Sequence, residues 1–156
     1  VTLKTLKSLH GCKTNYLRFL VSSYIRIKVR GYHLDQHGHL NNHGYTSFLE
    51  EARWALFENY NAIEFFSQID LTLTLVNCNI NYRRPCFFND ALEIHTKVMR
   101  IGNTSCKIDQ TIYIEGSSKI IADASNTFVL MDNHEHKAIP IRGQARDKLA
   151  QLADSA

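Results

Sequence analysis

The sequence contains few of the residues that interrupt a compact fold. Of its 156 residues, only two are proline and seven are glycine, which argues against disorder, collagen-like repeats or a long linker. No apolar run approaches the roughly 18 residues that a membrane span needs, so we expect no stable membrane insertion. These absences leave a globular protein as the expectation.

Cysteine is also sparse, and its spacing shows no sign of a disulfide framework. No two cysteines have the CxxC spacing, and no secretory signal precedes them. The four cysteines are Cys12, Cys78, Cys86 and Cys106. We expect them to be reduced thiols in a cytoplasmic protein.

A single basic block is missing as well. The net charge is +3, and lysine and arginine are scattered through the chain, so we expect no nucleic-acid partner. A modest positive excess suits an anionic small molecule at least as well. With 44% apolar and 21% charged residues, a chain of this length fits one domain that buries roughly two-thirds of its unfolded surface.

Residues 1–22 differ from the rest because they contain no acidic residue. This basic, loosely amphipathic segment is compatible with a membrane-surface or targeting element. The alternative is an accessory extension with no chemical role. We therefore divide the chain into an N-terminal extension over residues 1–22 and one domain over residues 23–156.

The domain is expected to begin with a strand and a long helix. Residues 24–30 alternate between apolar and mostly basic side chains, which is typical of a half-buried strand. Over residues 44–60, apolar side chains recur every three or four positions opposite a mostly charged face, which predicts an amphipathic helix. Asn41 or Asn42 can cap the first turn of this helix.

Strand patterns dominate the sequence after the helix. The strands are expected near residues 70–83, 91–101, 104–116 and 119–131. In the first of them the alternation changes phase between Leu75 and Val76, which predicts a β-bulge. Turn residues around Gly102 and Gly116 predict hairpins between the last three strands, and residues 143–153 are expected to form a terminal helix.

One long helix and at least five strands, mostly joined by hairpins, define the expected architecture. The helix must bury its apolar face against a sheet that curls around it. This is an α+β hotdog domain, an antiparallel sheet wrapped around one long central helix. Because a single sheet leaves an open edge that a second subunit can cover, we expect a homodimer or a homotetramer.

The polar loop before the helix contains the candidate catalytic group, Asp35. A helix start offers backbone N–H groups without intrahelical partners, and its dipole favours negative charge, so an oxyanion could be held there. A carboxylate a few residues upstream could supply a base or a nucleophile. The alternative is an ordinary turn residue, but Gly38 allows a close approach of backbone or ligand and favours the catalytic interpretation.

The same loop contains four histidines, which raise the possibility of a metal site. They are His33, His37, His39 and His43. Imidazole is the commonest protein metal ligand. However, no helix presents these side chains in an HExxH register and Gly38 breaks any regular projection, so we expect no metal and interpret them as solvated or loop-ordering residues.

Other polar residues could bind phosphates or a polar ligand arm. The guanidinium groups of Arg83, Arg84 and Arg100 are suited to phosphate, and the alternative is that they solubilise strand ends. Thr104 and Ser105, which follow the turn at Gly102, could contact a ligand or simply close a hairpin.

Several sequence strings resemble one enzyme family. The pattern Asp-x-x-Gly-His-x-Asn-Asn begins at Asp35, and the strings VRGYHLD, FLEEARW, NINYRRP and IADASNTFV follow one another in this order. Together they resemble the 4-hydroxybenzoyl-CoA thioesterase family of hotdog enzymes, and most closely its bacterial long-chain acyl-CoA thioesterase III branch. The similarity runs from about residue 24 to residue 149.

The resemblance implies an acyl-CoA thioesterase of fatty acid metabolism that acts without a cofactor. Asp35 then takes the position of the catalytic carboxylate, as general base or as nucleophile, and the two roles stay open. The backbone amide of Asn42 takes the position of the oxyanion hole. The resemblance also places four residues where the family often contacts CoA: Arg84, Gly102, Thr104 and Ser105.

Two other functions compete with hydrolysis. A hotdog dehydratase acting on hydroxyacyl thioesters needs a positioned histidine near a carboxylate, and His39 is available for that role. A non-catalytic acyl-CoA binding module would have lost the carboxylate or gained a DNA-reading segment. Asp35 is present, and residues 1–22 are too short for a convincing helix-turn-helix.

Overall fold

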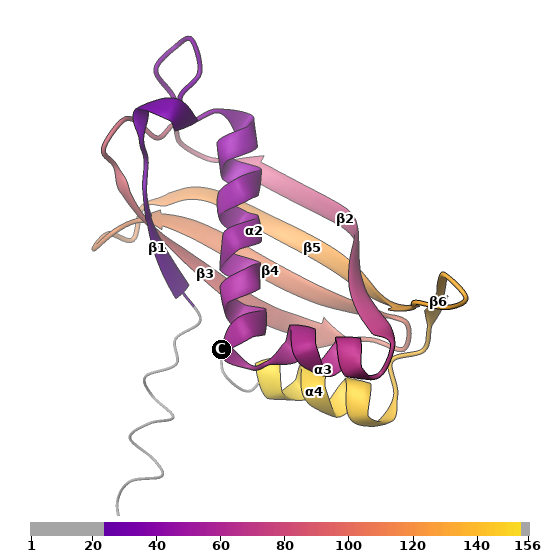
Figure 1. Cartoon of the computed structure of the whole chain (residues 1–156). Helices are drawn as coiled ribbons and strands as arrows, with labels where there is room; N and C mark the ends of the chain where they lie inside the picture. Colours follow the sequence, from indigo (N-terminus) through magenta and orange to yellow (C-terminus); the bar gives the residue numbers. More distant parts are fainter. Residues whose placement is uncertain (1–23, 154–156) are drawn as a thin grey trace, which may run out of the picture.

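The computed structural model describes residues 24–153. They form one sheet with helices packed against it (Figure 1). The elements in chain order are β1 (Tyr24–Lys28), η2 (Gly31–His33), α2 (Asn42–Asn59), α3 (Ala62–Gln68), β2 (Leu71–Tyr82), β3 (Ala91–Ile101), β4 (Ser105–Ile114), β5 (Ile120–Asp132), β6 (Lys137–Ile139) and α4 (Gly143–Ala153). The predicted extension over residues 1–22, with Cys12, lies outside the described residues.

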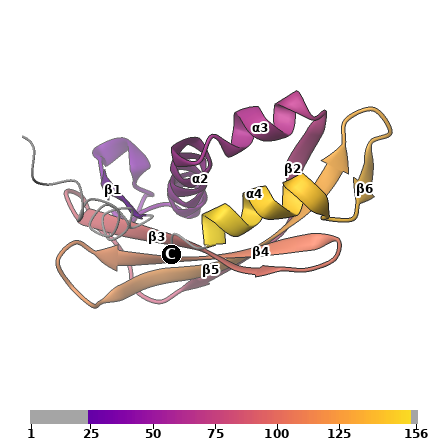
Figure 2. The same ribbon diagram turned by 90° about the horizontal axis from the view of Figure 1, so that it is seen from below.

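The sheet has the strand order β1-β3-β4-β5-β2, and the short strand β6 pairs with β5. Every pairing is antiparallel. Helices α2, α3 and α4 lie on the same face of the sheet (Figure 2). The predicted α+β hotdog architecture is therefore confirmed, with β1 and β2 as the edge strands of the described sheet.

Helix α2 forms because its apolar side chains recur at the helical period. Its buried hydrophobic side chains are Tyr45, Phe48, Leu49, Ala52 and Leu56. Asn41 is the N-cap, and its side-chain oxygen accepts a hydrogen bond from the backbone N–H of His43 at 3.0 Å, which satisfies one orphan donor of the first turn. With 18 residues, the helix is about 27 Å long.

The core under α2 consists of two hydrophobic clusters. One lies at the amino-terminal half of α2 and includes Leu49, Ile94, Ile112 and Ala124. The other lies at the carboxyl-terminal half and includes Leu56, Val98, Ile108 and Phe128. Each of the strands β3, β4 and β5 contributes inward-facing residues to both clusters, so the clusters follow one another along the strands.

A buried polar layer separates the two clusters. It consists of Arg53, Thr96, Gln110 and Asn126, all buried. The Gln110 amide joins them: its oxygen accepts from Arg53 Nη1 at 2.8 Å and from Asn126 Nδ2 at 3.1 Å. Its nitrogen donates to the Leu49 carbonyl at 2.8 Å and to Thr96 Oγ1 at 3.0 Å. These hydrogen bonds offset most of the cost of burying the polar groups, and among the described residues the Asn126 Oδ1 atom has no partner.

The predicted bulge and terminal helix are confirmed. The register of β2 against β5 shifts between Leu75 and Asn77, so Val76 is the extra residue, and α4 covers residues 143–153. Helix α3 and strand β6 were not predicted. Asn61 has a left-handed backbone with φ of +50°, which ends α2 and lets α3 start in a new direction.

Two further observations concern cysteine and membranes. Cys78, Cys86 and Cys106 are free thiols. Within residues 24–153, no helix is both long enough and apolar enough to cross a membrane.

Candidate active site

Asp35 lies in a tight loop that its own carboxylate helps to close. Its Oδ1 atom accepts hydrogen bonds from the backbone N–H groups of His37 at 2.8 Å and His39 at 3.1 Å. The Asp35 N–H donates to the His39 carbonyl at 2.8 Å. Gly38 turns the chain between them with φ of +77°, a conformation that favours glycine. The loop therefore fixes the orientation of the Asp35 side chain.

The electrostatic environment keeps this carboxyl ionised. Desolvation by neighbouring atoms acts to raise the pKa of Asp35, but the backbone N–H groups of His39 and His37 outweigh it. The pKa lies below the ordinary value of 3.8, because hydrogen bonds to the charged form favour it. Only Oδ1 is engaged: within residues 24–153, no hydrogen bond reaches Oδ2. A charged oxygen is thus free to act.

The start of α2 presents one open backbone donor. The Asn41 side chain covers the N–H of His43, and the Asn41 carbonyl accepts from the N–H of Gly44 at 2.8 Å and of Tyr45 at 3.3 Å. The N–H of Asn42 has no acceptor in the described part of the chain. The other N–H groups of the first turn are therefore occupied. The Asn42 amide, at the positive end of the helix dipole, is available to an oxygen ligand.

Asp35 and Asn42 both line one shallow pocket of about 330 Å³, which we call the Asp35 pocket. Its lining residues are Asp35, His39, Leu40, Asn42, Tyr45, Tyr82, Arg83, Arg84 and Pro85. Five of the residues singled out in the sequence therefore come together: Asp35, His39, Asn42, Arg83 and Arg84.

Two tyrosines in this pocket were not recognised from the sequence. Tyr45 and Tyr82 pack edge to face with ring centroids 5.0 Å apart, and the Tyr45 hydroxyl donates to the Arg84 carbonyl at 3.4 Å. Burial raises the pKa of Tyr45, so its hydroxyl stays protonated. In the sequence, Tyr45 fits the apolar face of the helix and Tyr82 fits the alternation of a strand. Only the tertiary contact between α2 and β2 brings the two side chains together.

Some N–H groups of the two arginines at the pocket already bond to other residues of the chain. Arg84 Nη1 donates to the Ile120 carbonyl at 2.9 Å, and Arg83 forms an ion pair with Asp123. Both side chains remain exposed. They can therefore present further N–H groups to an anion at the rim of the pocket.

The four loop histidines do not form one cluster, although the rings of His37 and His39 lie 6.5 Å apart between centroids. His33 accepts from the Arg30 N–H at 2.9 Å and packs edge-on against Phe48, at 4.8 Å between ring centroids. The His39 ring packs on Phe87, at 5.2 Å, and His43 lies on the first turn of α2. No group of three or more potential ligands that could hold a metal ion is found in residues 24–153.

Gly102, Thr104 and Ser105 lie at the opposite end of the molecule. They form the turn between β3 and β4, where the Gly102 N–H donates to the Ser105 carbonyl at 2.8 Å. The 11 residues of β3 separate this turn from the Asp35 pocket by about 35 Å. Within one chain these three residues and Asp35 therefore cannot contact the same reacting group.

Comparisons with known proteins agree with this fold. Residues 29–149 match the family model described as the thioesterase-like superfamily. The chain is 41% identical over 127 residues to the long-chain acyl-CoA thioesterase FadM of Escherichia coli, which covers 81% of this chain and 96% of that protein. The crystal structure of YbaW, a probable thioesterase from Escherichia coli, matches with a TM-score of 0.80 at 40% identity, over 83% of this chain and 98% of that one.

A more distant structure shows the fold alone. Slr0204 from Synechocystis, a 1,4-dihydroxy-2-naphthoyl-CoA thioesterase, matches with a TM-score of 0.72 at 17% identity, over 83% of this chain and 93% of that one. The fold of this chain is thus shared with a thioesterase that acts on 1,4-dihydroxy-2-naphthoyl-CoA.

Proposed function

The chain belongs to the thioesterase-like superfamily, and we propose that it hydrolyses long-chain acyl-CoA to a free fatty acid and CoA. The observation that carries the proposal is the pairing, in one pocket, of a free Asp35 carboxylate oxygen with an open Asn42 amide. Hydrolysis of a thioester needs both, a group that delivers oxygen to the carbonyl carbon and a donor for the oxyanion that forms. The 41% identity to FadM favours a long acyl chain.

In the proposed reaction the thioester carbonyl oxygen accepts a hydrogen bond from the backbone N–H of Asn42. If Asp35 is a general base, it takes a proton from water while the water oxygen adds to the carbonyl carbon. The C–S bond then breaks, and the CoA thiolate receives the proton. If Asp35 is the nucleophile, Oδ2 adds to the carbonyl carbon and the C–S bond breaks, which leaves a mixed anhydride and the CoA thiolate. Water then hydrolyses the anhydride, which restores the Asp35 carboxylate and releases the fatty acid and a proton for the thiolate. The lowered pKa of Asp35 keeps the carboxylate ionised, as both routes require.

The CoA portion is proposed to lie over the arginine side of the pocket. Arg84, with Arg83 beside it, offers guanidinium donors to phosphate. Gly102, Thr104 and Ser105 could contact CoA only if a second copy brought its β3–β4 turn to this pocket. A homodimer or homotetramer would allow this, and the unpaired edge of β2 is a candidate contact.

The proposed chemistry requires neither a metal nor a redox cofactor, since carboxylate, amide and water supply every group that reacts. A dehydratase is less well supported, because the His39 ring packs on Phe87 and the hydrogen bonds between His39 and Asp35 come from the His39 backbone. A binding module without activity is also less well supported, because the carboxylate is present and unobstructed.

The test is thiol release from a panel of acyl-CoA substrates, from short to long chains and including an aroyl-CoA. We expect release to be fastest with long chains and to persist in EDTA. Loss of activity in EDTA with recovery in zinc would contradict the metal-free chemistry. Conversion of hydroxyacyl-CoA to enoyl-CoA without thiol release would replace hydrolysis with dehydration.

A further inference from the structure

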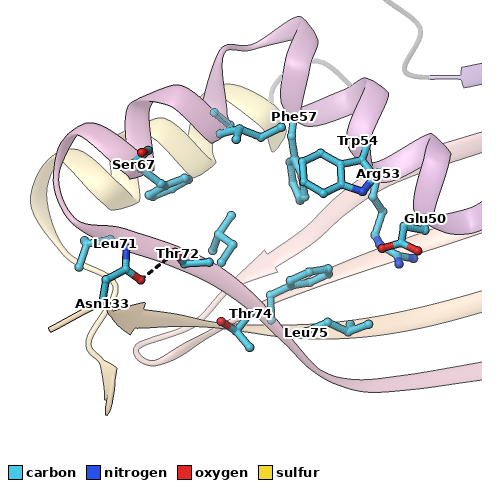
Figure 3. Close-up of a pocket in the computed structure, with 15 residues that line it drawn as sticks. Glu50, Arg53, Trp54, Phe57, Ser67, Leu71, Thr72, Thr74, Leu75 and Asn133 are labelled. Atoms are coloured by element: carbon cyan, nitrogen blue, oxygen red, sulfur yellow. Dashed lines mark hydrogen bonds between the residues drawn. The ribbon is translucent and has the colours of Figure 1, made fainter. Parts of the chain in front are cut away.

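A second and larger cavity, of about 580 Å³, lies between the carboxyl-terminal half of α2, helix α3 and strand β2 (Figure 3). We call it the α2–β2 cavity. Its walls are mainly hydrophobic: four aromatic rings, Trp54, Phe57, Phe66 and Phe128, face the leucines of β2. A cavity with this lining favours an apolar ligand.

Most polar side chains of the cavity lie at its two ends, and Thr74 lies between them (Figure 3). Glu50 and Arg53 lie at one end, and Ser67, Thr72 and Asn133 at the other (Figure 3). Thr72 and Asn133 already hydrogen-bond to each other at 2.8 Å, and Arg53 bonds to Gln110. Apart from Thr74, the middle of the cavity therefore offers mainly hydrocarbon contacts.

The α2–β2 cavity and the Asp35 pocket lie along the same pair of elements. Asn42 of α2 and Tyr82 of β2 line the Asp35 pocket, whereas Arg53 and Leu75 line the cavity further along both elements. Strand β2 is close to α2 near Tyr82 and diverges from it toward α3 (Figure 1). The cavity lies where α2 and β2 are further apart, toward the carboxyl-terminal end of α2 from Asn42.

Helix geometry gives the distance between the two sites. Eight residues separate Asn42 from Glu50, which corresponds to about 12 Å along the axis of α2. With carbon–carbon bonds of about 1.5 Å, an extended hydrocarbon chain advances about 1.25 Å per carbon. About ten carbons are thus needed to reach the cavity from a carbonyl held at Asn42, and about eighteen to reach the level of Phe57.

We propose that the α2–β2 cavity receives the distal part of a linear acyl chain whose carbonyl lies at the Asn42 amide. This inference rests on the proposed function and adds the residues that select the chain. Chains of about eight carbons end before the cavity, whereas those of about sixteen fill much of it. Each methylene buried there strengthens binding about fourfold, so the cavity favours long chains over short ones.

Trp54 provides a direct test, because it is the only tryptophan of the chain and is 45% exposed beside the cavity. The Asp35→Asn variant is titrated with hexadecanoyl-CoA and with octanoyl-CoA, and tryptophan emission is recorded. We expect a saturable blue shift with hexadecanoyl-CoA and none with octanoyl-CoA. No shift with hexadecanoyl-CoA, or equal shifts with both, overturns the inference.

Cavity-filling variants test selectivity by turnover. Ser67 lies at the far end of the cavity and is exposed, and Leu75 is 40% exposed near Glu50, so both positions can accept a larger side chain. We expect Ser67→Trp and Leu75→Trp to lower the ratio of kcat/KM for hexadecanoyl-CoA over octanoyl-CoA at least tenfold. Gln144→Trp is the matched control, since Gln144 is an exposed helix residue outside the cavity, and we expect it to keep the wild-type ratio.

The results separate this inference from the proposed function. A folded wild type that turns over both substrates, together with filling variants that keep the wild-type ratio, overturns the cavity assignment and leaves hydrolysis standing. An emission shift specific to hexadecanoyl-CoA, in a protein whose wild type releases no thiol from any acyl-CoA, supports the cavity and overturns hydrolysis.

Discussion

Asp35 differs from a second aspartate with nearly the same local geometry. Asp132 Oδ1 also accepts two backbone N–H groups, from His134 at 2.8 Å and Glu135 at 2.9 Å, and these lower the pKa of Asp132 as well. Asp132, however, lies at the end of β5 and lines none of the pockets described above. The turn alone therefore does not identify a catalytic carboxylate, and what distinguishes Asp35 is the open helix amide that faces the same pocket.

The pH dependence of hydrolysis follows from the ionisation of Asp35. The active form is the carboxylate, and its pKa lies below 3.8, so activity is lost only as the pH falls through that lowered value. We expect kcat/KM to stay level from about pH 7 down to about pH 5. A pH profile of thiol release checks this, and an acidic limb centred above about pH 5 would contradict the assignment.

Much of the candidate active site could be proposed from the sequence because it is local. Asp35, His39 and Asn42 lie within eight consecutive residues of one loop, so the sequence alone brings them close together. Tyr82 reaches the pocket only because β2 contacts α2 there. No local sequence pattern predicts this contact. The separation of Ser105 from Asp35 is likewise a property of the sheet topology.

At the scale of elements, the N-cap of α2 affects both the stability of the protein and the candidate active site. Asn41→Ala removes the acceptor for the His43 N–H and is expected to destabilise the protein by about 1 kcal/mol. It should also lower kcat, because the Asn42 amide loses the cap that orients it. Urea unfolding and thiol release measure the two effects. Asn42→Ala is the comparison, and we expect it to be mild because only the backbone of Asn42 is required.

The elements that were predicted have strong periodic patterns, whereas those that were missed are short. Helix α2 has 18 residues and β2 has 12, so their apolar periods are evident. Helix α3 has seven residues and β6 has three, too few to establish a period. Their positions depend instead on tertiary contacts, such as the burial of Phe66 in the second cluster.

At the scale of the whole molecule, the polar layer is a structural constraint within an otherwise apolar core. Gln110→Leu would leave the buried Arg53 guanidinium without its acceptor, and we expect a loss of about 3 kcal/mol in the free energy of unfolding. Arg53→Met removes the charge and leaves the Gln110 oxygen paired with Asn126, so we expect a loss below about 2 kcal/mol. Chemical denaturation of both variants tests this order, and equal losses would contradict it.

The central claim, that Asp35 carries out thioester hydrolysis, is tested most directly by thiol release from hexadecanoyl-CoA with the Asp35→Asn variant. Asp132→Asn is the matched control, since it removes the same charge from a similar turn. We expect Asp35→Asn to fold normally and to lose at least about 100-fold in kcat, while Asp132→Asn keeps wild-type turnover. Near-native turnover by Asp35→Asn would contradict the account.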